Sequence, residues 1–167
     1  MTASSPSSRP LLGLIALLAL AALAFALFSQ HVLGMAPCAW CILQRQIVVV
    51  IAVVAALGWW AGGRHPGAVS VAAGVSGVLA LGGIVAAWYQ HTVAANSFSC
   101  DLSVADRVVT ASRLDQWLPQ VFGIYATCAD SAVDLIGVPY ELWSLMMFVL
   151  LAALAIRVMA PRRRRPA

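Results

Sequence analysis

The chain has 167 residues, of which 62% are hydrophobic and only 10% are charged, and its mean hydropathy is +0.91. A water-soluble domain carries about a quarter charged residues and about half apolar ones, so a single soluble core cannot hide this much apolar surface. We expect residues 1–167 to form one domain whose solvent is largely lipid.

The formal charge of +4 does not indicate a nucleic-acid-binding protein. All ten basic residues are arginines, four of which form the run 162–165, and all six acids lie between Asp101 and Glu141. Nucleic-acid-binding proteins instead gather basic residues on one helix, face or groove. The sequence contains no such basic helix or basic–aromatic pattern.

Four segments approach the roughly 20 apolar residues that a transmembrane helix needs. They are residues 11–29, 42–61, 68–89 and 142–160. Lipid offers no partner for unpaired backbone groups, so each segment should be helical. The sequence therefore predicts an all-α membrane protein built as a four-helix transmembrane bundle.

The first span competes with a cleaved signal peptide, because Ala24-Phe25-Ala26 is similar to a cleavage site. Its apolar stretch is longer than the roughly 7–15 residues of a signal core, and only Arg9 supplies a positive charge before it. These features favour a helix that is retained in the mature protein.

The arginines predict the orientation of the spans. Arg9 precedes the first span, Arg64 lies between the second and third, and Arg157 with the 162–165 run lies at the end of the fourth. With four spans these regions share one side of the bilayer, which their positive charge marks as cytoplasmic. Both termini are therefore expected inside, with outer loops at residues 30–41 and 90–141.

All four cysteines fall in the outer loops, Cys38 and Cys41 in the first and Cys100 and Cys128 in the second. Outside the cytoplasm an even number of cysteines indicates disulfides. Cys38-Ala39-Trp40-Cys41 has the spacing of a small, reversible disulfide. It leads into a helix N-terminus, where the helix dipole stabilises a thiolate. We therefore expect this pair to be redox-active.

Two other interpretations of the Cys38–Cys41 pair stay open. A zinc site needs two more ligands, and Cys100 and Cys128 are not a matching close pair. An inert bridge needs no neighbouring charge, yet Arg45 lies one helical turn after Cys41 on the same face. An arginine within a span costs about 2.5–3.5 kcal/mol unless it snorkels to the interface. Arg45 is thus either an interfacial anchor or a cation beside a thiolate and a polar acceptor.

Cys100 and Cys128 enclose residues 101–127, and closing a loop of that size stabilises a fold by about 3 kcal/mol. A structural bridge between them is therefore credible. Within this loop, apolar side chains recur at helical spacing, at Leu114, Trp117, Leu118, Val121 and Phe122. We expect a short amphipathic helix on the membrane surface, shortened or kinked by Pro119.

His91 follows the third span directly, beside Tyr89 and Gln90. A lone histidine at a membrane edge is ordinarily a solvated cap, although it can also contribute to a site. The sequence around it does not decide between the two.

Taken in order, these motifs resemble the DsbB family of bacterial inner-membrane, quinone-dependent disulfide oxidases, from about Leu11 to Met159. The resemblance is carried first by residues 30–33 (QHVL), Pro37-Cys38-Ala39-Trp40-Cys41, Arg45 and Tyr89-Gln90-His91-Thr92. Residues 114–122 (LDQWLPQVF) and Cys128-Ala129-Asp130 complete it. Each motif alone is weak, but their order and spacing together are specific.

The resemblance implies a four-helix bundle with two periplasmic loops and an electron path through the cysteines. A reduced periplasmic DsbA-like dithiol protein would attack Cys100, and Cys128 would pass the electrons to the Cys38–Cys41 disulfide. Cys41 would face a membrane quinone, either ubiquinone or menaquinone, and Arg45 and His91 match the family's quinone-site positions. DsbA has a potential near −120 mV, about the strongest oxidant of its class, so only a better acceptor can regenerate it.

One departure from the family is Gln44, which stands where the best-known member has an acidic residue before the arginine. A membrane reductase, or an enzyme resembling vitamin K epoxide reductase, would also place a dithiol pair at a helix end. A small structural membrane protein held by two inert disulfides is the remaining alternative, and Arg45 beside Cys41 argues against it. The ordered motifs favour the oxidase.

Overall fold

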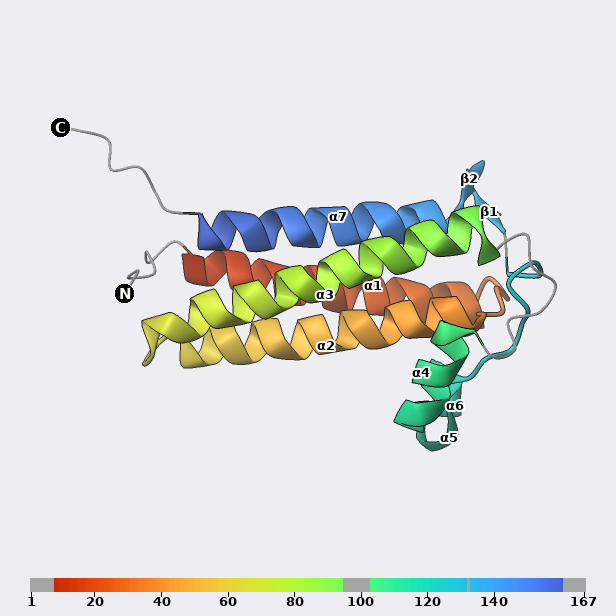
Figure 1. Ribbon diagram of the computed structural model, residues 1–167, viewed down its shortest axis with the longest axis horizontal. Helices are drawn as coiled ribbons and strands as arrows, with labels where there is room; N and C mark the ends of the chain where they lie inside the picture. The colour runs from red at the N-terminus through yellow and green to blue at the C-terminus, as the bar shows by residue number, and fades with distance from the viewer. Residues whose placement is uncertain (1–7, 95–102, 132, 161–167) are drawn as a thin grey trace.

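Four long helices form a bundle, shown in the computed structural model of Figure 1, which describes residues 8–94, 103–131 and 133–160. They are α1 (Ser8–His31), α2 (Ala39–Ala61), α3 (Pro66–Thr92) and α7 (Tyr140–Met159). Each is long and apolar enough to cross a membrane. The predicted fold class, a four-helix membrane protein, is confirmed.

The helices extend beyond the predicted spans, chiefly at the end of the bundle that carries the loops. α1 continues to His31, α2 begins at Ala39, and α3 continues to Thr92. Hydropathy marks only the part of a helix that lies in hydrocarbon, whereas backbone hydrogen bonds carry the helix on into polar surroundings. As a result Cys41, Gln90 and His91 lie on helices and not in loops.

The first turn of α1, the last turn of α7 and the connection between α2 and α3 lie together at one end of the bundle (Figure 1). Arg9 lies over the Trp59 ring at 5.2 Å and donates to the Trp59 carbonyl at 2.8 Å, while Arg64 lies over Trp60 at 5.4 Å. Arginine and tryptophan pairs of this kind are typical of a membrane–water interface.

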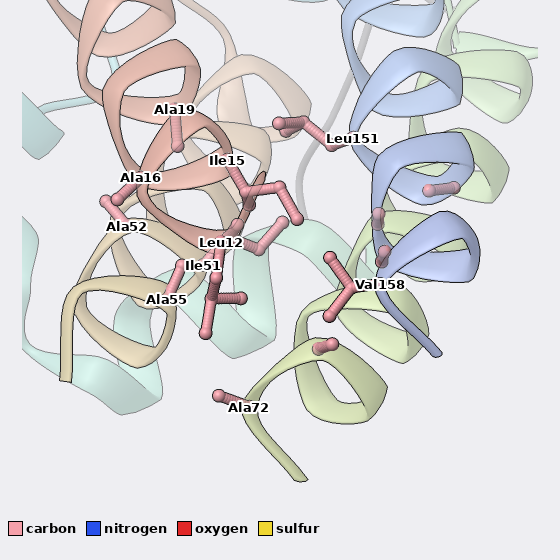
Figure 2. Close-up of a cluster of buried hydrophobic side chains, with 14 of the residues drawn as sticks. Leu12, Ile15, Ala16, Ala19, Ile51, Ala52, Ala55, Ala72, Leu151 and Val158 are labelled. Atoms are coloured by element: carbon pink, nitrogen blue, oxygen red, sulfur yellow. The ribbon is translucent and has the colours of Figure 1, made fainter. Parts of the chain in front are cut away.

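The core of the bundle is built largely from small side chains (Figure 2). α1 packs against α2 and α7, and α3 packs against α2 and α7. In lipid, helices associate through close backbone approach and van der Waals contact, which alanine and glycine permit. Buried alanines from all four helices meet larger residues such as Leu12, Ile15, Ile51 and Leu151.

The second outer loop contains three short helices, α4 (Val104–Ser112), α5 (Leu114–Trp117) and α6 (Pro119–Phe122). They lie beside the loop-bearing end of α2 (Figure 1). A two-residue hairpin, β1 (Asp134–Leu135) and β2 (Val138–Pro139), leads into α7. The helix α4 was not predicted, although Ser103 caps it by accepting a hydrogen bond from the Asp106 amide at 3.1 Å.

The segment 114–122 is two separate turns instead of the single amphipathic helix that was predicted. Pro119 has no N–H for a continuous helix, so α5 ends at Trp117 and α6 restarts at the proline. The apolar stripe divides as well: Phe122 is buried with Ile42 of α2, while the Trp117 side chain is 82% exposed. Only part of the stripe is therefore free to meet a membrane surface.

We predict that Gly83→Ala destabilises the bundle, because a Cβ at Gly83 would overlap the ring of Phe148 on α7. Overpacking a buried contact of this kind costs about 1–3 kcal/mol. The neighbouring Gly82→Ala is a matched control, since a Cβ there meets nothing within 4 Å. Thermal unfolding of both variants in detergent should show a lower midpoint for Gly83→Ala alone. Equal midpoints would mean that Phe148 moves away without loss.

Candidate functional site

The first cysteine pair lies at the start of α2, where Cys38 is the N-cap residue and Cys41 belongs to the first turn. The two thiols are free, and their sulfurs are 3.4 Å apart. Cys38 is fully buried, whereas Cys41 is partly exposed. Pro37 precedes the N-cap and is compatible with its extended backbone. The sequence therefore brings both sulfurs to one helix N-terminus, within reach of disulfide formation.

The environment of Cys38 favours its thiolate. Its hydrogen bond with Cys41 lowers the pKa of the Cys38 thiol from 9.0 to about 6, against the opposing effect of burial. The Ser131 hydroxyl and nearby backbone groups act in the same direction as Cys41. A helix N-terminus adds a partial positive charge. At neutral pH the reduced pair therefore carries one negative charge.

The second outer loop is attached to the first directly beside this pair. The amides of Tyr125 and Ala126 donate to the Pro37 carbonyl at 3.0 and 3.3 Å. Cys128, two residues after Ala126, is buried in the same cluster as Cys38 and Trp40. Cys128 is disulfide-bonded. Its predicted partner, Cys100, lies outside the described residues, so that pairing stays a prediction.

Cys41 also lines a cavity of about 230 Å³. Its wall is mostly apolar and comes from all four long helices, with Phe25 of α1, Val48 of α2 and Phe148 of α7 among its members. The polar groups on the wall are Cys41, Gln44, Arg45, Gln90, Tyr140, Glu141 and Ser144. An apolar cavity with a few convergent polar groups is the usual form of a small-molecule site.

Arg45 is buried, with 7% of its surface exposed, and lines this cavity. Its Nη2 donates to the Ala26 carbonyl at 3.0 Å, and its Nη1 donates to the Val121 carbonyl at 2.9 Å and to the Gln30 side-chain oxygen. These oxygens are all neutral, and within the described ranges no carboxylate forms a salt bridge with it. An arginine that snorkels to the interface would be exposed. This one is turned into the protein.

Two amides stand beside the Cys41 sulfur. Gln90 donates to it at 3.3 Å, and Gln44 donates to the Gln90 side-chain oxygen at 2.6 Å. Gln44 and Gln90 are 5% and 4% exposed, so this chain of hydrogen bonds is buried. Gln44 therefore orients Gln90 rather than Arg45. A neutral donor at sulfur stabilises a thiolate without adding a charge of its own.

His91 does not line the cavity. Its Nδ1 lies 3.0 Å from Oε1 of Glu141, and Glu141 lines the wall. The His91 side chain is 34% exposed, whereas that of Glu141 is 4% exposed. His91 thus reaches the cavity only through the carboxyl group.

The structure brings Cys38, Cys41 and Arg45 together, and Cys128 joins them from the second loop. Sequence reasoning did not identify Gln90 and Glu141 as site residues. Gln90 had a signal, since a glutamine beside the predicted end of a span is costly unless hydrogen-bonded. Glu141 had a similar one, as the acid directly before the last predicted span. In neither case does spacing along the chain reveal the partner.

Comparison with known proteins gives a consistent result. The family model described as disulfide bond formation protein DsbB matches residues 8–158. Disulfide bond formation protein B of Ralstonia nicotianae is 34% identical over 165 residues, which cover 95% of this chain and 98% of that protein. Disulfide bond formation protein B of Burkholderia pseudomallei is 34% identical over 153 residues, covering 91% and 89%. Disulfide bond formation protein B 1 of Pseudomonas savastanoi is 35% identical over 142 residues, covering 84% and 83%.

We predict that the Cys38 thiolate of the reduced protein forms with a midpoint near pH 6, and that Cys41→Ala moves the midpoint up toward 9.0. The hydrogen bond with Cys41 is the largest cause of the lowered pKa, and the substitution removes it. Ultraviolet thiolate absorbance during a pH titration measures both midpoints, with Cys38→Ala as the blank.

The lowered pKa of Cys38 also makes the stability of the reduced protein depend on pH. Because the folded-state pKa is depressed, this group should stabilise the reduced protein increasingly as pH rises from about 6 to 9.0. If Cys41→Ala kept a midpoint near pH 6, Ser131 and the helix N-terminus would account for the thiolate instead.

Proposed function

The chain belongs to the DsbB family of disulfide bond formation proteins, and we propose that it is a thiol–disulfide oxidase that reoxidises a periplasmic DsbA-like dithiol protein and passes the electrons to a membrane quinone. It is a multi-pass membrane protein with a disulfide-forming oxidoreductase role. The observation that carries the proposal is the cavity, because one wall holds both the Cys41 sulfur and a buried cation. An inert disulfide needs neither.

The cavity suits the head group of a quinone. A cavity of about 150 Å³ accepts benzene in a protein core, and this one, at about 230 Å³, has room for a single substituted ring. Its apolar walls match the ring faces, and the quinone oxygens are hydrogen-bond acceptors that a guanidinium can bind. Arg45 and Cys41 would hold the head group, and a quinone would supply a two-electron acceptor dissolved in the bilayer.

The electron path begins in the second loop. A thiolate of the reduced partner attacks Cys100 of the proposed Cys100–Cys128 disulfide, and the partner's second thiol completes its own disulfide, leaving Cys100 and Cys128 reduced. The Cys128 thiolate then attacks Cys38 of the oxidised Cys38–Cys41 pair, and Cys41 leaves beside the cavity as a thiolate, which takes up a proton released by the outer thiols. Closure of Cys100 onto Cys128 restores the outer bridge. Each exchange moves one electron pair.

The contacts between the loops support the step from Cys128 to Cys38. Tyr125 and Ala126 hold the approach to Cys128 against Pro37, and both sulfurs lie in one buried cluster. A lowered pKa makes Cys38 a good leaving group when Cys100 attacks Cys128 of the mixed disulfide, and so favours closure of the outer bridge. Departure of Cys41 from the Cys38–Cys41 disulfide is favoured because Gln90 donates a hydrogen bond to the Cys41 sulfur. Transfer of the electrons to a quinone in the cavity would then draw the exchange forward.

We place the protein in the bacterial inner membrane with both termini in the cytoplasm. Arg9 is in the first turn of α1 and Arg64 lies between α2 and α3, elements that meet at the end of the bundle with the described termini (Figure 1), and Arg157 is in the last turn of α7. The cysteine-bearing end then faces the periplasm, where disulfides persist.

Arg45→Met should lower quinone affinity or the rate of quinone-dependent reoxidation by roughly tenfold to a hundredfold, because hydrogen bonds to charged groups contribute about 1.5–3 kcal/mol. Arg45→Lys should recover only part of the loss, since an ammonium lacks the planar fork of donors. The measurement is turnover of a reduced DsbA-like protein against quinone concentration. Arg64→Met, at the far end of the bundle, is the control and should match the wild type.

The result must be separated from a loss of folding, because Arg45 also binds α1 and α6. Thermal unfolding in the absence of quinone gives that correction. Superimposable quinone curves for the wild type and both Arg45 variants would remove the cavity from the proposed mechanism.

Cys100→Ser should abolish turnover with the reduced DsbA-like protein while dithiothreitol-reduced Cys38–Cys41 is still reoxidised by quinone at the wild-type rate. The reason is that the variant lacks the outer bridge but keeps the inner pair and its cavity. Normal turnover of the DsbA-like protein by Cys100→Ser would exclude the two-step relay. Failure of quinone to reoxidise the inner pair even in the wild type would exclude the quinone.

A further inference from the structure

Glu141, in the first turn of α7, is an ionisable group of the cavity that the mechanism above does not use. Its side chain is 4% exposed and lines the wall. One carboxyl oxygen contacts His91, and the other, Oε2, is buried without a hydrogen-bond partner among the described residues. Burying a polar atom without a hydrogen-bond partner is unfavourable. Such an atom in a ligand cavity indicates a group that acts on the ligand.

His91 connects this carboxyl group to the outer solution. The ring lies in the last turn of α3 and is one-third exposed, and its Nδ1 is 3.0 Å from Glu141 Oε1. The other ionisable groups of the wall are Cys41, Arg45 and Tyr140. The Tyr140 hydroxyl is 2.9 Å from Ser29, a residue with 2% exposure that donates in turn to the Ala26 carbonyl. That chain leads inward, whereas the chain from Glu141 leads to solvent.

The chemistry of the site requires a proton from outside. Reduction of a quinone to a quinol takes up two electrons and two protons. At neutral pH the reduced cysteine pair has already released one of its two protons, because the pKa of Cys38 is about 6. The pair can therefore supply both electrons but only one proton. The second proton must enter the cavity by another route.

We propose that Glu141 is a catalytic residue that delivers this second proton to the quinone, and that His91 is a positioning residue that recharges Glu141 from the periplasmic solution. The inference rests on the proposed function, since it assumes that a quinone occupies the cavity. Glu141 thus acts on the quinone directly, whereas His91 acts only through Glu141 and does not contact the quinone.

The Cys38 thiolate and the Cys41 thiol form their disulfide and give up two electrons, and the Cys41 proton is the first of the two protons. The Glu141 carboxyl group gives the second, and His91 returns a proton to it from water. One thiolate, one thiol, one quinone and one proton thus become one disulfide and one quinol. The disulfide and the quinol that form carry no net charge.

The test uses the full-length protein in nanodiscs, reduced beforehand, and a short-chain ubiquinone analogue as the probe. Glu141→Gln keeps the shape of the side chain but cannot carry the proton, and Glu141→Asp keeps the acid. Asp134→Asn, an exposed acid-to-amide change in β1, is the matched control. Three quantities are measured: analogue affinity of the oxidised protein, single-turnover oxidation of the cysteine pair across pH, and the thermal midpoint.

Glu141→Gln should bind the analogue as tightly as the wild type, while its oxidation rate near neutral pH falls by about 100-fold or more, as for loss of a general acid. Its residual rate should decline in proportion to proton concentration, because only protons from solution remain. Glu141→Asp should recover part of the rate, and Asp134→Asn should match the wild type. His91→Gln should give a smaller loss with the same pH dependence, and it keeps the test valid if Glu141→Gln does not fold.

The same measurements distinguish failure of the proposed function from failure of the role proposed for Glu141. If the wild-type pair is not oxidised by the analogue, the proposed function fails and this inference fails with it. If the wild type is oxidised and Glu141→Gln has the same rate and pH profile, the inference is wrong while the function stands. If Glu141→Gln only weakens binding, with normal oxidation at saturation, Glu141 binds the quinone and donates no proton.

Discussion

A guanidinium buried near the end of a transmembrane bundle needs hydrogen-bond partners, and both terminal nitrogens of Arg45 donate to oxygens from other elements. Ala26 and Gln30 belong to α1 and Val121 belongs to α6. Leaving a buried charge without partners costs about 3–5 kcal/mol. Arg45 therefore helps to hold the outer loop against the bundle while it lines the cavity.

The attachment of α6 has a second consequence, because the chain beyond it leads to Cys128. From Val121 the backbone continues to Tyr125 and Ala126, which donate to the Pro37 carbonyl next to Cys38. Two short connections thus bring a loop cysteine to a helix N-terminus. The inner pair then has a sulfur partner on its loop side and an apolar cavity on its bundle side, which separates exchange with thiols from transfer into the membrane.

The sequence was sufficient for the four spans, because the bilayer dictates their length and apolarity, and for the Cys38–Cys41 pair, whose spacing is short-range. It was not sufficient for α4, although Ser103-Val104-Ala105-Asp106 carries the serine and acid spacing of a helix start. The amphipathic segment was expected to be one short helix, shortened or kinked by Pro119, whereas Pro119 divides it into two separate turns. Glu141 lies 50 positions from His91, and only the packing of α3 on α7 makes them neighbours.

The distribution of charge in the cavity follows from its low dielectric. Beside Cys41 stand two amides, Gln44 and Gln90, where a carboxylate would oppose a thiolate by about 4 kcal/mol at 4 Å and an effective dielectric of 20. The acid of the wall, Glu141, is on α7, where its carboxyl group contacts His91 and not the sulfur that receives the electrons. Electrons that enter such a cavity alone would leave it charged. A proton path through Glu141 lets each electron pair enter the cavity together with its protons. The electrons then add no charge to the cavity, so the same wall residues suit it before and after reduction.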